Sequence, residues 1–229
     1  MSRIILDIET SGLGLDALEP SMREYMLRGA ETKEQVREVD ETLSFYPLTA
    51  QVVAIGTLNV DTLKGGMYYL APPDINKQPS TRLEEEGVTY EAFDDEGSLL
   101  IKFWDTVKGY DSIVTYNGRG FDCPFLLARS AIHKIKPTKE LMPNRYSSDE
   151  HIDLMDRLTH FGAVRRRFSL DMWCRGFGIK SPKEEVSGKE VPGMFREGRY
   201  LEIAQYCARD LFATRELLLY WEKYMRFRK

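Results

Sequence analysis

Five side chains in three separate stretches of the sequence have the types and spacing expected of a cation-binding site. Asp7 and Glu9 stand two residues apart near the N-terminus. Asp122 follows a glycine-containing turn in the middle of the chain, and Tyr206 and Asp210 stand four residues apart near its end. Carboxylate oxygens are the ligands that Mg²⁺ and Mn²⁺ prefer. A shared site requires a fold that brings the three stretches together.

Each stretch alone also has a simpler explanation. Residues two apart on a strand point to the same face, so Asp7 and Glu9 would project together, but such a pair also occurs at solvated strand ends. An aspartate at a helix start, such as Asp122, commonly caps that helix. Tyr206 and Asp210 would share one helical face, where a half-buried tyrosine beside an exposed aspartate is a common arrangement.

The elements that would position these residues follow from the apolar pattern. Runs rich in β-branched and aromatic residues predict strands, the first of them ending in Asp7 and Glu9, with turn residues at 10–14. Apolar residues at helical spacing predict helices, with Asp122 at the start of one and Asp210 near an expected break in the last. The predicted strands are 3–9, 51–60, 66–70, 111–116 and 151–154, and the helices are 99–107, 121–132, 169–177 and 201–224.

A charged segment at about 16–48 predicts a helical insertion after the first strand. Thr32 and Gln35 in this segment fit a capping box, and apolar residues follow at helical spacing. The chain contains no repeat and no convincing linker, so we expect one domain over residues 1–229. Strands and helices together predict an α/β fold, with a central sheet of about five strands flanked by helices.

Composition narrows the class of protein. Of the 229 residues, 42% are hydrophobic and 30% are charged, which is typical of a globular protein. The net charge of −4 argues against a protein that coats nucleic acid through phosphate neutralisation. Three widely spaced cysteines, without a C-x-x-C pair, argue against a disulfide framework or a thiolate zinc site. With no signal peptide and no membrane-spanning run in the sequence, we expect a cytoplasmic protein.

Taken in order, the three stretches resemble the motifs of the DEDD superfamily of 3′–5′ exonucleases. The sequence DIET at 7–10 matches the first motif, N-x-x-x-F-D at 117–122 the second, and Y-x-x-x-D at 206–210 the third. Position 205, where the histidine branch has its histidine, is glutamine, whereas Tyr206 matches the tyrosine branch. The layout is most similar to the exonuclease domains of family B DNA polymerases and to related stand-alone bacterial proteins.

This resemblance implies a ribonuclease-H-like fold with a mixed sheet, and a catalytic site. It implies that two divalent metal ions, Mg²⁺ or Mn²⁺, act with a water molecule that is oriented by Tyr206. The water would attack the terminal phosphodiester bond and release a nucleoside 5′-monophosphate. The metal ligands implied are Asp7, Glu9, Asp122 and Asp210.

The resemblance also implies contacts with substrate. Thr10 and Leu13 would border the 3′ end of the strand, and Asn117 and Phe121 would hold the strand beside Asp122. The implied partner is nucleic acid, bound through a single-stranded 3′ end, with DNA favoured over RNA. A proofreading or repair role would need a separate polymerase or repair partner.

Two other functions stay open at this point. The chain could be a catalytically silent nucleic-acid-binding module. Weak or absent binding of Mn²⁺ would favour this alternative. It could instead hydrolyse nucleotides, short oligonucleotides or RNA, which a panel of substrates would decide. Asp153 is a further candidate, either as an auxiliary acid near the site or as the cap of a helix beginning at Leu154.

Overall fold

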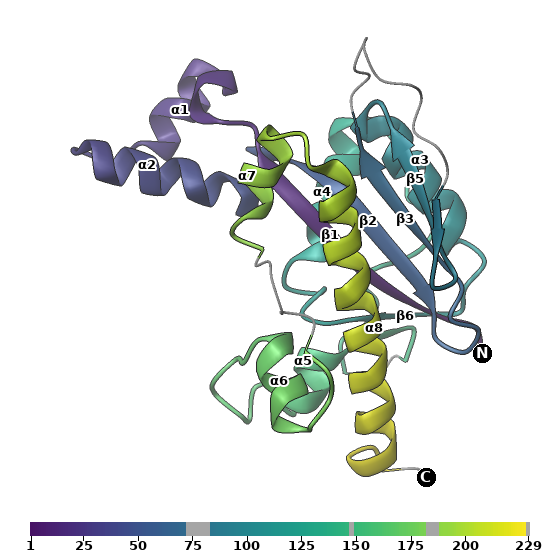
Figure 1. Ribbon diagram of the computed structural model, residues 1–229. Coiled ribbons are helices and arrows are strands. Elements are labelled where there is room, and N and C mark those ends of the chain that lie inside the picture. Colours follow the sequence, from purple (N-terminus) through teal and green to yellow (C-terminus); the bar gives the residue numbers. More distant parts are fainter. Residues whose placement is uncertain (72–82, 147–148, 182–187, 228–229) are drawn as a thin grey trace.

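A mixed β-sheet forms the centre of the protein (Figure 1). The computed structural model describes residues 1–71, 83–146, 149–181 and 188–227. Within these residues the sheet has seven strands in the order β4-β5-β3-β2-β1-β6-β7. The strands are β1 (Arg3–Gly12), β2 (Ala50–Asn59), β3 (Gly65–Leu70), β4 (Leu83–Glu85), β5 (Val88–Phe93), β6 (Ser112–Thr115) and β7 (His151–Asp153).

β1 is the central strand of this sheet. It pairs antiparallel with β2 and parallel with β6. β3 continues antiparallel from β2, and β7 continues parallel from β6. These five strands correspond to the five predicted ones, and the expected ribonuclease-H-like α/β fold is confirmed.

Two predictions about the strands were wrong. The sheet has seven described strands rather than about five, because β5 pairs parallel with β3 and β4 pairs antiparallel with β5. Apolar and polar residues alternate over much of β5, which is typical of a strand. Its pairing with β3 could not be read from the sequence, because the two strands are not consecutive in the chain. β1 also extends to Gly12, through residues predicted as a turn, with a register shift between Glu9 and Thr10.

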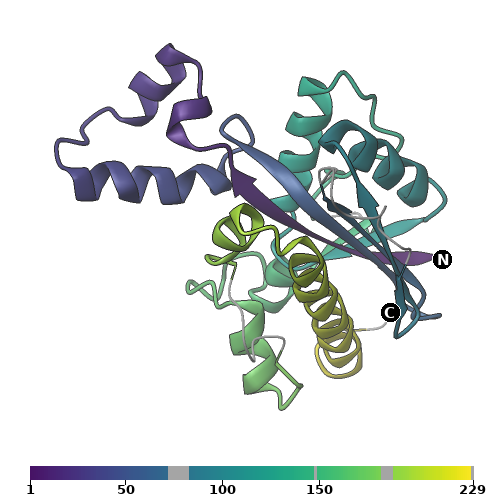
Figure 2. The ribbon, with the colours of Figure 1, turned by 45° about the horizontal axis from the view of Figure 1, so that its top comes forward.

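Helices cover both faces of the sheet. The long helix α8 crosses one face, whereas α3 and α4 lie behind the other (Figures 1 and 2). The predicted break near Asp210 was wrong, since α8 is continuous over 25 residues. The sequence between Tyr200 and Tyr224 has no glycine or proline to interrupt it. The helices are α1 (Pro20–Met26), α2 (Lys33–Thr42), α3 (Glu96–Val107), α4 (Asp122–Ile132), α5 (Leu154–Leu158), α6 (Leu170–Gly176), α7 (Val191–Arg196) and α8 (Tyr200–Tyr224).

The predicted insertion after the first strand is helical, as expected. Helices α1 and α2 project away from the sheet (Figure 2). The predicted capping box begins α2. The backbone N–H of Gln35 donates a hydrogen bond to the Thr32 side-chain oxygen, and the backbone N–H of Thr32 donates one to the Gln35 side-chain oxygen. A small apolar cluster of its own, around Leu15, Leu18 and Leu43, holds this segment together.

A buried ion pair fixes α4 against the sheet. The Glu96 side chain on α3 is 5% exposed and accepts hydrogen bonds from Arg129 Nε at 2.9 Å and Arg129 Nη2 at 2.6 Å. The same carboxylate accepts the Val52 amide hydrogen of β2 at 2.8 Å. The partners satisfy the buried charge, and together they tie α3, α4 and β2 to one another.

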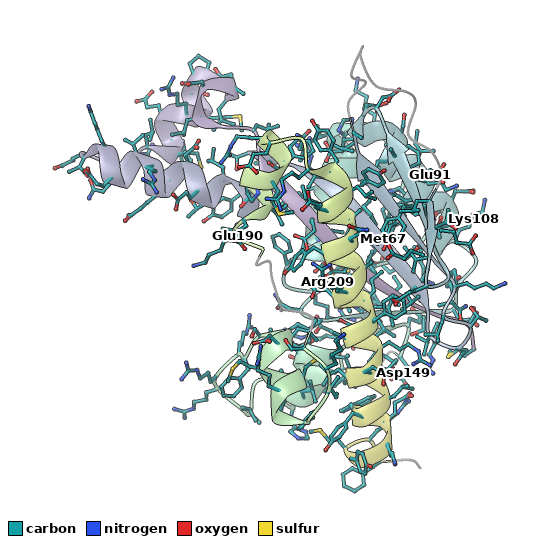
Figure 3. All side chains as sticks on the ribbon, in the orientation of Figure 1. Met67, Glu91, Lys108, Asp149, Glu190 and Arg209 are labelled. Atoms are coloured by element: carbon teal, nitrogen blue, oxygen red, sulfur yellow. The ribbon has the colours of Figure 1, made fainter. Side chains whose placement is uncertain are left out.

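A glycine allows α8 to lie close to the sheet. Gly56 on β2 stands opposite Asp7 of β1. A Cβ atom at this position would be 2.8 Å from Leu211 Cδ1 and 2.8 Å from Met67 Sδ, closer than real contacts allow. Met67 is labelled beside α8 in Figure 3. The missing side chain therefore lets α8 approach the strand that carries Asp7.

Candidate active site

Asp7 and Glu9 share one face of β1, as the alternation of a strand requires. Both are half-buried, and Ile8 between them is buried. Asp7 stands opposite Gly56 and Glu9 opposite Ala54, two small residues of β2. The two carboxylates therefore have room on the face that α8 covers.

Asp122 begins α4 and connects it to β1. Its side chain is 4% exposed, and its Oδ1 atom accepts the backbone hydrogen of Ile8 at 3.0 Å. Asp122 is the first residue of the helix, and Phe121 occupies the N-cap position. Asp122 is therefore not the N-cap of α4. Its carboxylate instead accepts a hydrogen bond from the central strand, next to Asp7.

Asp153 holds the turn that leads into Asp122. Its carboxylate accepts the amide hydrogens of Asn117 at 3.0 Å and Arg119 at 2.9 Å. It also accepts the Met155 amide hydrogen at 3.0 Å and so caps α5. This is the capping role that the sequence suggested for a helix beginning at Leu154. Asn117 has a left-handed backbone with φ of 62°, and these bonds stabilise that conformation.

Tyr206 and Asp210 lie one helical turn apart on α8 and reach the same cavity. Tyr206 is 3% exposed and Asp210 is half-buried. The cavity has a volume of about 350 Å³. Its described lining includes side chains from all three motifs, namely Asp7, Asn117, Phe121, Asp122, Tyr206 and Asp210. The structure therefore brings residues from both ends and the middle of the chain to one place.

The predicted site residues Glu9, Thr10 and Leu13 lie outside the described lining of this cavity. Glu9 lies beside Asp7, since ligand atoms of the two residues are within 4.8 Å of each other. The Thr10 hydroxyl is buried and donates a hydrogen bond to the Ser44 carbonyl oxygen at 2.7 Å. Leu13 is 38% exposed after the end of β1, where the chain turns toward the helical insertion.

The carboxylates in this region disfavour each other's ionisation. Burial raises the pKa of the Asp7 carboxyl well above its usual range, and the charges of Asp122, Asp210 and Glu9 raise it further. Burial also raises the pKa of Asp122 to about 7, with smaller contributions from the charges of Asp153 and Asp210. A divalent cation would reverse both shifts, because opposite charge favours the ionised form.

Tyr206 stays protonated at neutral pH. Burial raises the pKa of its phenol above the usual value, and the negative charges of Asp210, Glu9 and Asp7 raise it further. A neutral phenol can donate a hydrogen bond but is a poor general base. The neutral phenol of Tyr206 therefore suits positioning of a water molecule better than removal of its proton.

Cys207 is a further member of this group that the sequence motifs did not indicate. Its Sγ atom lies 3.3 Å from Asp7 Oδ2 and 3.7 Å from the Asp7 carbonyl oxygen. The available signal was its position three residues before Asp210 on a helix, which places the two side chains on neighbouring positions of the helix surface. Tyr116, Ser169, Leu170 and Asp171 also line the cavity and were missed.

The donor set fits hard divalent cations. Asp7 and Glu9 supply oxygens from the central strand, Asp122 from the start of α4, and Asp210 from α8. Burial and mutual repulsion raise the pKa of Asp7 and of Asp122, and a bound cation would stabilise the ionised carboxylates.

Among the described helices, none has the length and apolar character of a membrane span.

Comparison with known proteins places the chain in a family. Over 134 aligned residues it is 31% identical to an uncharacterised protein of Methanocaldococcus jannaschii, and the aligned region covers 54% of this chain and 73% of that protein. Over 88 aligned residues it is 33% identical to DNA polymerase 1 of Sulfurisphaera ohwakuensis, and the aligned region covers 35% of this chain and 9% of the polymerase. Residues 75–228, which include Asp122, Tyr206 and Asp210, match a family profile. The chain belongs to that family, the predicted 3′–5′ exonucleases related to the exonuclease domain of PolB.

Proposed function

We propose that this protein is a metal-dependent 3′–5′ exonuclease that hydrolyses the terminal phosphodiester bond of a nucleic-acid strand, with DNA favoured, and releases nucleoside 5′-monophosphates. The observation that carries the proposal is the convergence of Asp7, Asp122, Tyr206 and Asp210 on one cavity. Membership of an exonuclease-related family supports it.

Asp7, Glu9, Asp122 and Asp210 would hold two divalent cations, Mg²⁺ or Mn²⁺. When bound, such a pair stabilises the attacking and leaving oxygens of an in-line displacement. Asp122 keeps its carboxylate aimed beside β1 through its hydrogen bond with Ile8. The four carboxylates would thus supply the ligand oxygens, and this hydrogen bond fixes the orientation of the Asp122 carboxylate.

Tyr206 would donate a hydrogen bond to the attacking water, since its phenol is neutral. Asn117 and Phe121 would hold the strand beside Asp122, because both line the cavity. The Phe121 ring packs on Phe125, with ring centroids 5.4 Å apart, which restricts its movement. Thr10 and Leu13 would border the 3′ end, and the exposed Leu13 side chain is the one available for contact.

Three proposals about the cellular context accompany this activity. Residues 1–229 would form a single domain, and the protein would act in the cytoplasm. For any proofreading or repair role we propose a separate polymerase or repair partner.

Digestion of end-labelled strands tests the activity. DNA and RNA, single- and double-stranded, would be labelled at either end and incubated with Mg²⁺, Mn²⁺ or a chelator. We expect a 5′-labelled strand to shorten by single nucleotides and a 3′ label to appear as a mononucleotide, with neither product in chelator. Asp210→Asn should abolish both products. Glu216→Gln, at an exposed position of the same helix, is the matched control and should leave them unchanged.

Other results would contradict the proposal in distinct ways. Full-length strands in every metal condition would indicate a silent binding module. Dinucleotides and free nucleotides would be included as further substrates, and cleavage confined to them would indicate a hydrolase of small substrates. Cleavage that persists in chelator would contradict the role of the carboxylates as metal ligands.

A further inference from the structure

Cys207 places a thiol among the proposed metal ligands. Its side chain is fully buried and reaches from α8 to β1, where Sγ lies 3.3 Å from Asp7 Oδ2. One ligand atom each from Asp7, Glu9 and Cys207 lie within 4.8 Å of one another. This group comes from two elements that Gly56 allows to approach closely, since a Cβ there would stand 3.1 Å from the Cys207 sulfur.

A sulfur ligand changes which cations such a group prefers. Mg²⁺ and Mn²⁺ bind oxygen and gain little from sulfur, whereas Zn²⁺ and Cd²⁺ bind thiolate strongly. Two carboxylates and one thiolate are a donor set that zinc accepts, with its fourth position left to water. The same two carboxylates are among the four that the proposed nuclease needs for Mg²⁺ or Mn²⁺. A thiophilic cation would therefore compete for them.

We propose that Asp7, Glu9 and Cys207 form a binding site for a thiophilic divalent cation, Zn²⁺ or Cd²⁺, and that its occupation excludes the cations required for catalysis. The thiol loses its proton to solvent as the sulfur–metal bond forms. The binding site stands on the geometry of the three side chains alone. Its inhibitory effect rests on the proposed nuclease function.

The alternative role for Cys207 is purely positional. Its thiol hydrogen bond could hold the Asp7 carboxylate in place without any contact with metal. Serine can donate the same hydrogen bond but is a poor ligand for Cd²⁺. Cys207→Ser therefore separates the two roles, because it removes the soft ligand and keeps the donor.

Cadmium titration of the reduced, chelator-treated protein tests the site directly. Cadmium bound to thiolate absorbs in the ultraviolet through charge transfer, so the signal does not depend on nuclease activity. We expect this band to saturate at one Cd²⁺ per wild-type chain and to be absent in Cys207→Ser. Cys174→Ser, which removes another buried thiol on α6, should keep the band. Circular dichroism would confirm that each variant is folded, and Cys207→Ala provides a second variant without the thiol.

Binding affinity gives a quantitative outcome. Loss of an outer-shell partner of a metal typically costs about 10–100-fold in affinity, so loss of Cys207 should weaken Cd²⁺ and Zn²⁺ binding at least about 10-fold. Mn²⁺ affinity should change less than that. A band of equal strength in Cys207→Ser, or no band in the folded wild type, would overturn the site.

Nuclease assays then separate the site from the proposed function. With Mg²⁺ present, the Zn²⁺ concentration that halves the rate should rise at least about 10-fold in Cys207→Ser. A cadmium band in a wild-type protein that cleaves no substrate would support the site and refute the nuclease. Cleavage without a cadmium band would support the nuclease and refute the site.

Discussion

Ile8 and Asp122 are 114 residues apart in the sequence, yet the backbone N–H of Ile8 donates a hydrogen bond of 3.0 Å to the Asp122 carboxylate. This contact sets a buried acid beside Asp7, another acid whose pKa is raised by burial and by its neighbours. Buried carboxylates that repel one another weaken the fold unless a cation compensates them. We interpret this cost as the consequence of a metal-binding role.

Asp7→Asn tests that interpretation at the residue scale. The substitution removes one negative charge and one ligand while keeping the shape of the side chain. We expect nuclease activity to fall by at least about 100-fold, since even outer-shell changes at metal sites cost about 10–100-fold. The metal-free protein should unfold at the same or a higher temperature. A variant that cleaves at a rate close to wild type would contradict the assignment.

Tyr206→Phe should have a milder effect. Loss of one hydrogen bond of ~0.5–1.5 kcal/mol corresponds to a rate decrease of about two- to thirteen-fold. Because burial raises the pKa of the Tyr206 phenol, its ionisation lies outside the neutral range. The dependence of the rate on pH should therefore have the same shape in both proteins. An unchanged rate would remove the role of Tyr206 in orienting water.

Residue types and spacing were sufficient to nominate the acids and Tyr206, because a strand and a helix impose known periodicities. They were not sufficient for Cys207, whose proximity to Asp7 depends on how closely α8 packs on the sheet. Nor could they show that the Thr10 hydroxyl is engaged by Ser44, a partner that the helical insertion brings back to β1. Contacts between distant segments are what the sequence pattern leaves undetermined.

At the scale of elements, the approach of α8 to the sheet positions the third motif. Gly56→Ala would place a methyl group 2.8 Å from Leu211 Cδ1 and 2.8 Å from Met67 Sδ, so these side chains of α8 and β3 must shift. We expect the free energy of unfolding to fall by about 1–3 kcal/mol, the usual cost of overpacking. Mn²⁺ affinity should fall as well, because the new methyl group would stand 3.1 Å from the sulfur of Cys207, which contacts Asp7.

Gly109→Ala is the matched control for this experiment. A Cβ atom at Gly109 would meet no neighbouring atom within 4 Å. Urea denaturation and Mn²⁺ titration of both variants would provide the comparison. Equal stability and equal metal affinity in Gly56→Ala and the wild type would show that close approach at this glycine is unimportant.

The sequence predicted the elements that carry the motifs better than those around them. Five strands and the helices beginning near Asp122 and Ser169 were anticipated from strong apolar patterns. The β4–β5 pair was missed because it joins the sheet through a parallel pairing with β3. The expected break in α8 was wrong because Tyr206 and Thr214, one turn before and one turn after Asp210, are both buried, so the packed face of the helix continues through Asp210.

For the whole molecule, crowded acids predict an unusual dependence of stability on pH. The pKa of Asp122 rises from its usual 3.8 to about 7 in the folded protein. Between these values the folded state binds more protons than the unfolded state, so the free energy of unfolding contributed by Asp122 falls as pH rises from about 4 to about 7. Above that range the contribution is constant.

Urea denaturation of the chelator-treated protein at several pH values measures this effect. Asp122→Asn keeps an oxygen that can accept the Ile8 hydrogen bond but cannot ionise. Relative to this variant, the wild type should lose stability as pH rises through the same range. Added Mn²⁺ should restore the wild type and not the variant. Parallel pH curves for the two proteins would contradict the prediction.

The family relationship covers most of the chain but not all of the proposed site. Residues 75–228 match the family profile, whereas Asp7 and Glu9 lie before this region. The connection between the two parts rests on the fold, in which β1 is central and pairs with both β2 and β6. The proposed metal centre is therefore a property of the whole molecule rather than of any one motif.

Calorimetric titration of Mn²⁺ into the chelator-treated protein tests the convergence of these acids most directly. We predict two ions bound per wild-type chain, with binding strongly reduced in Asp7→Asn and in Asp210→Asn although these residues lie at opposite ends of the sequence. Glu216→Gln should bind as the wild type does. If the wild type binds no Mn²⁺, or if the two aspartate variants bind it unchanged, the carboxylates do not form a common metal centre.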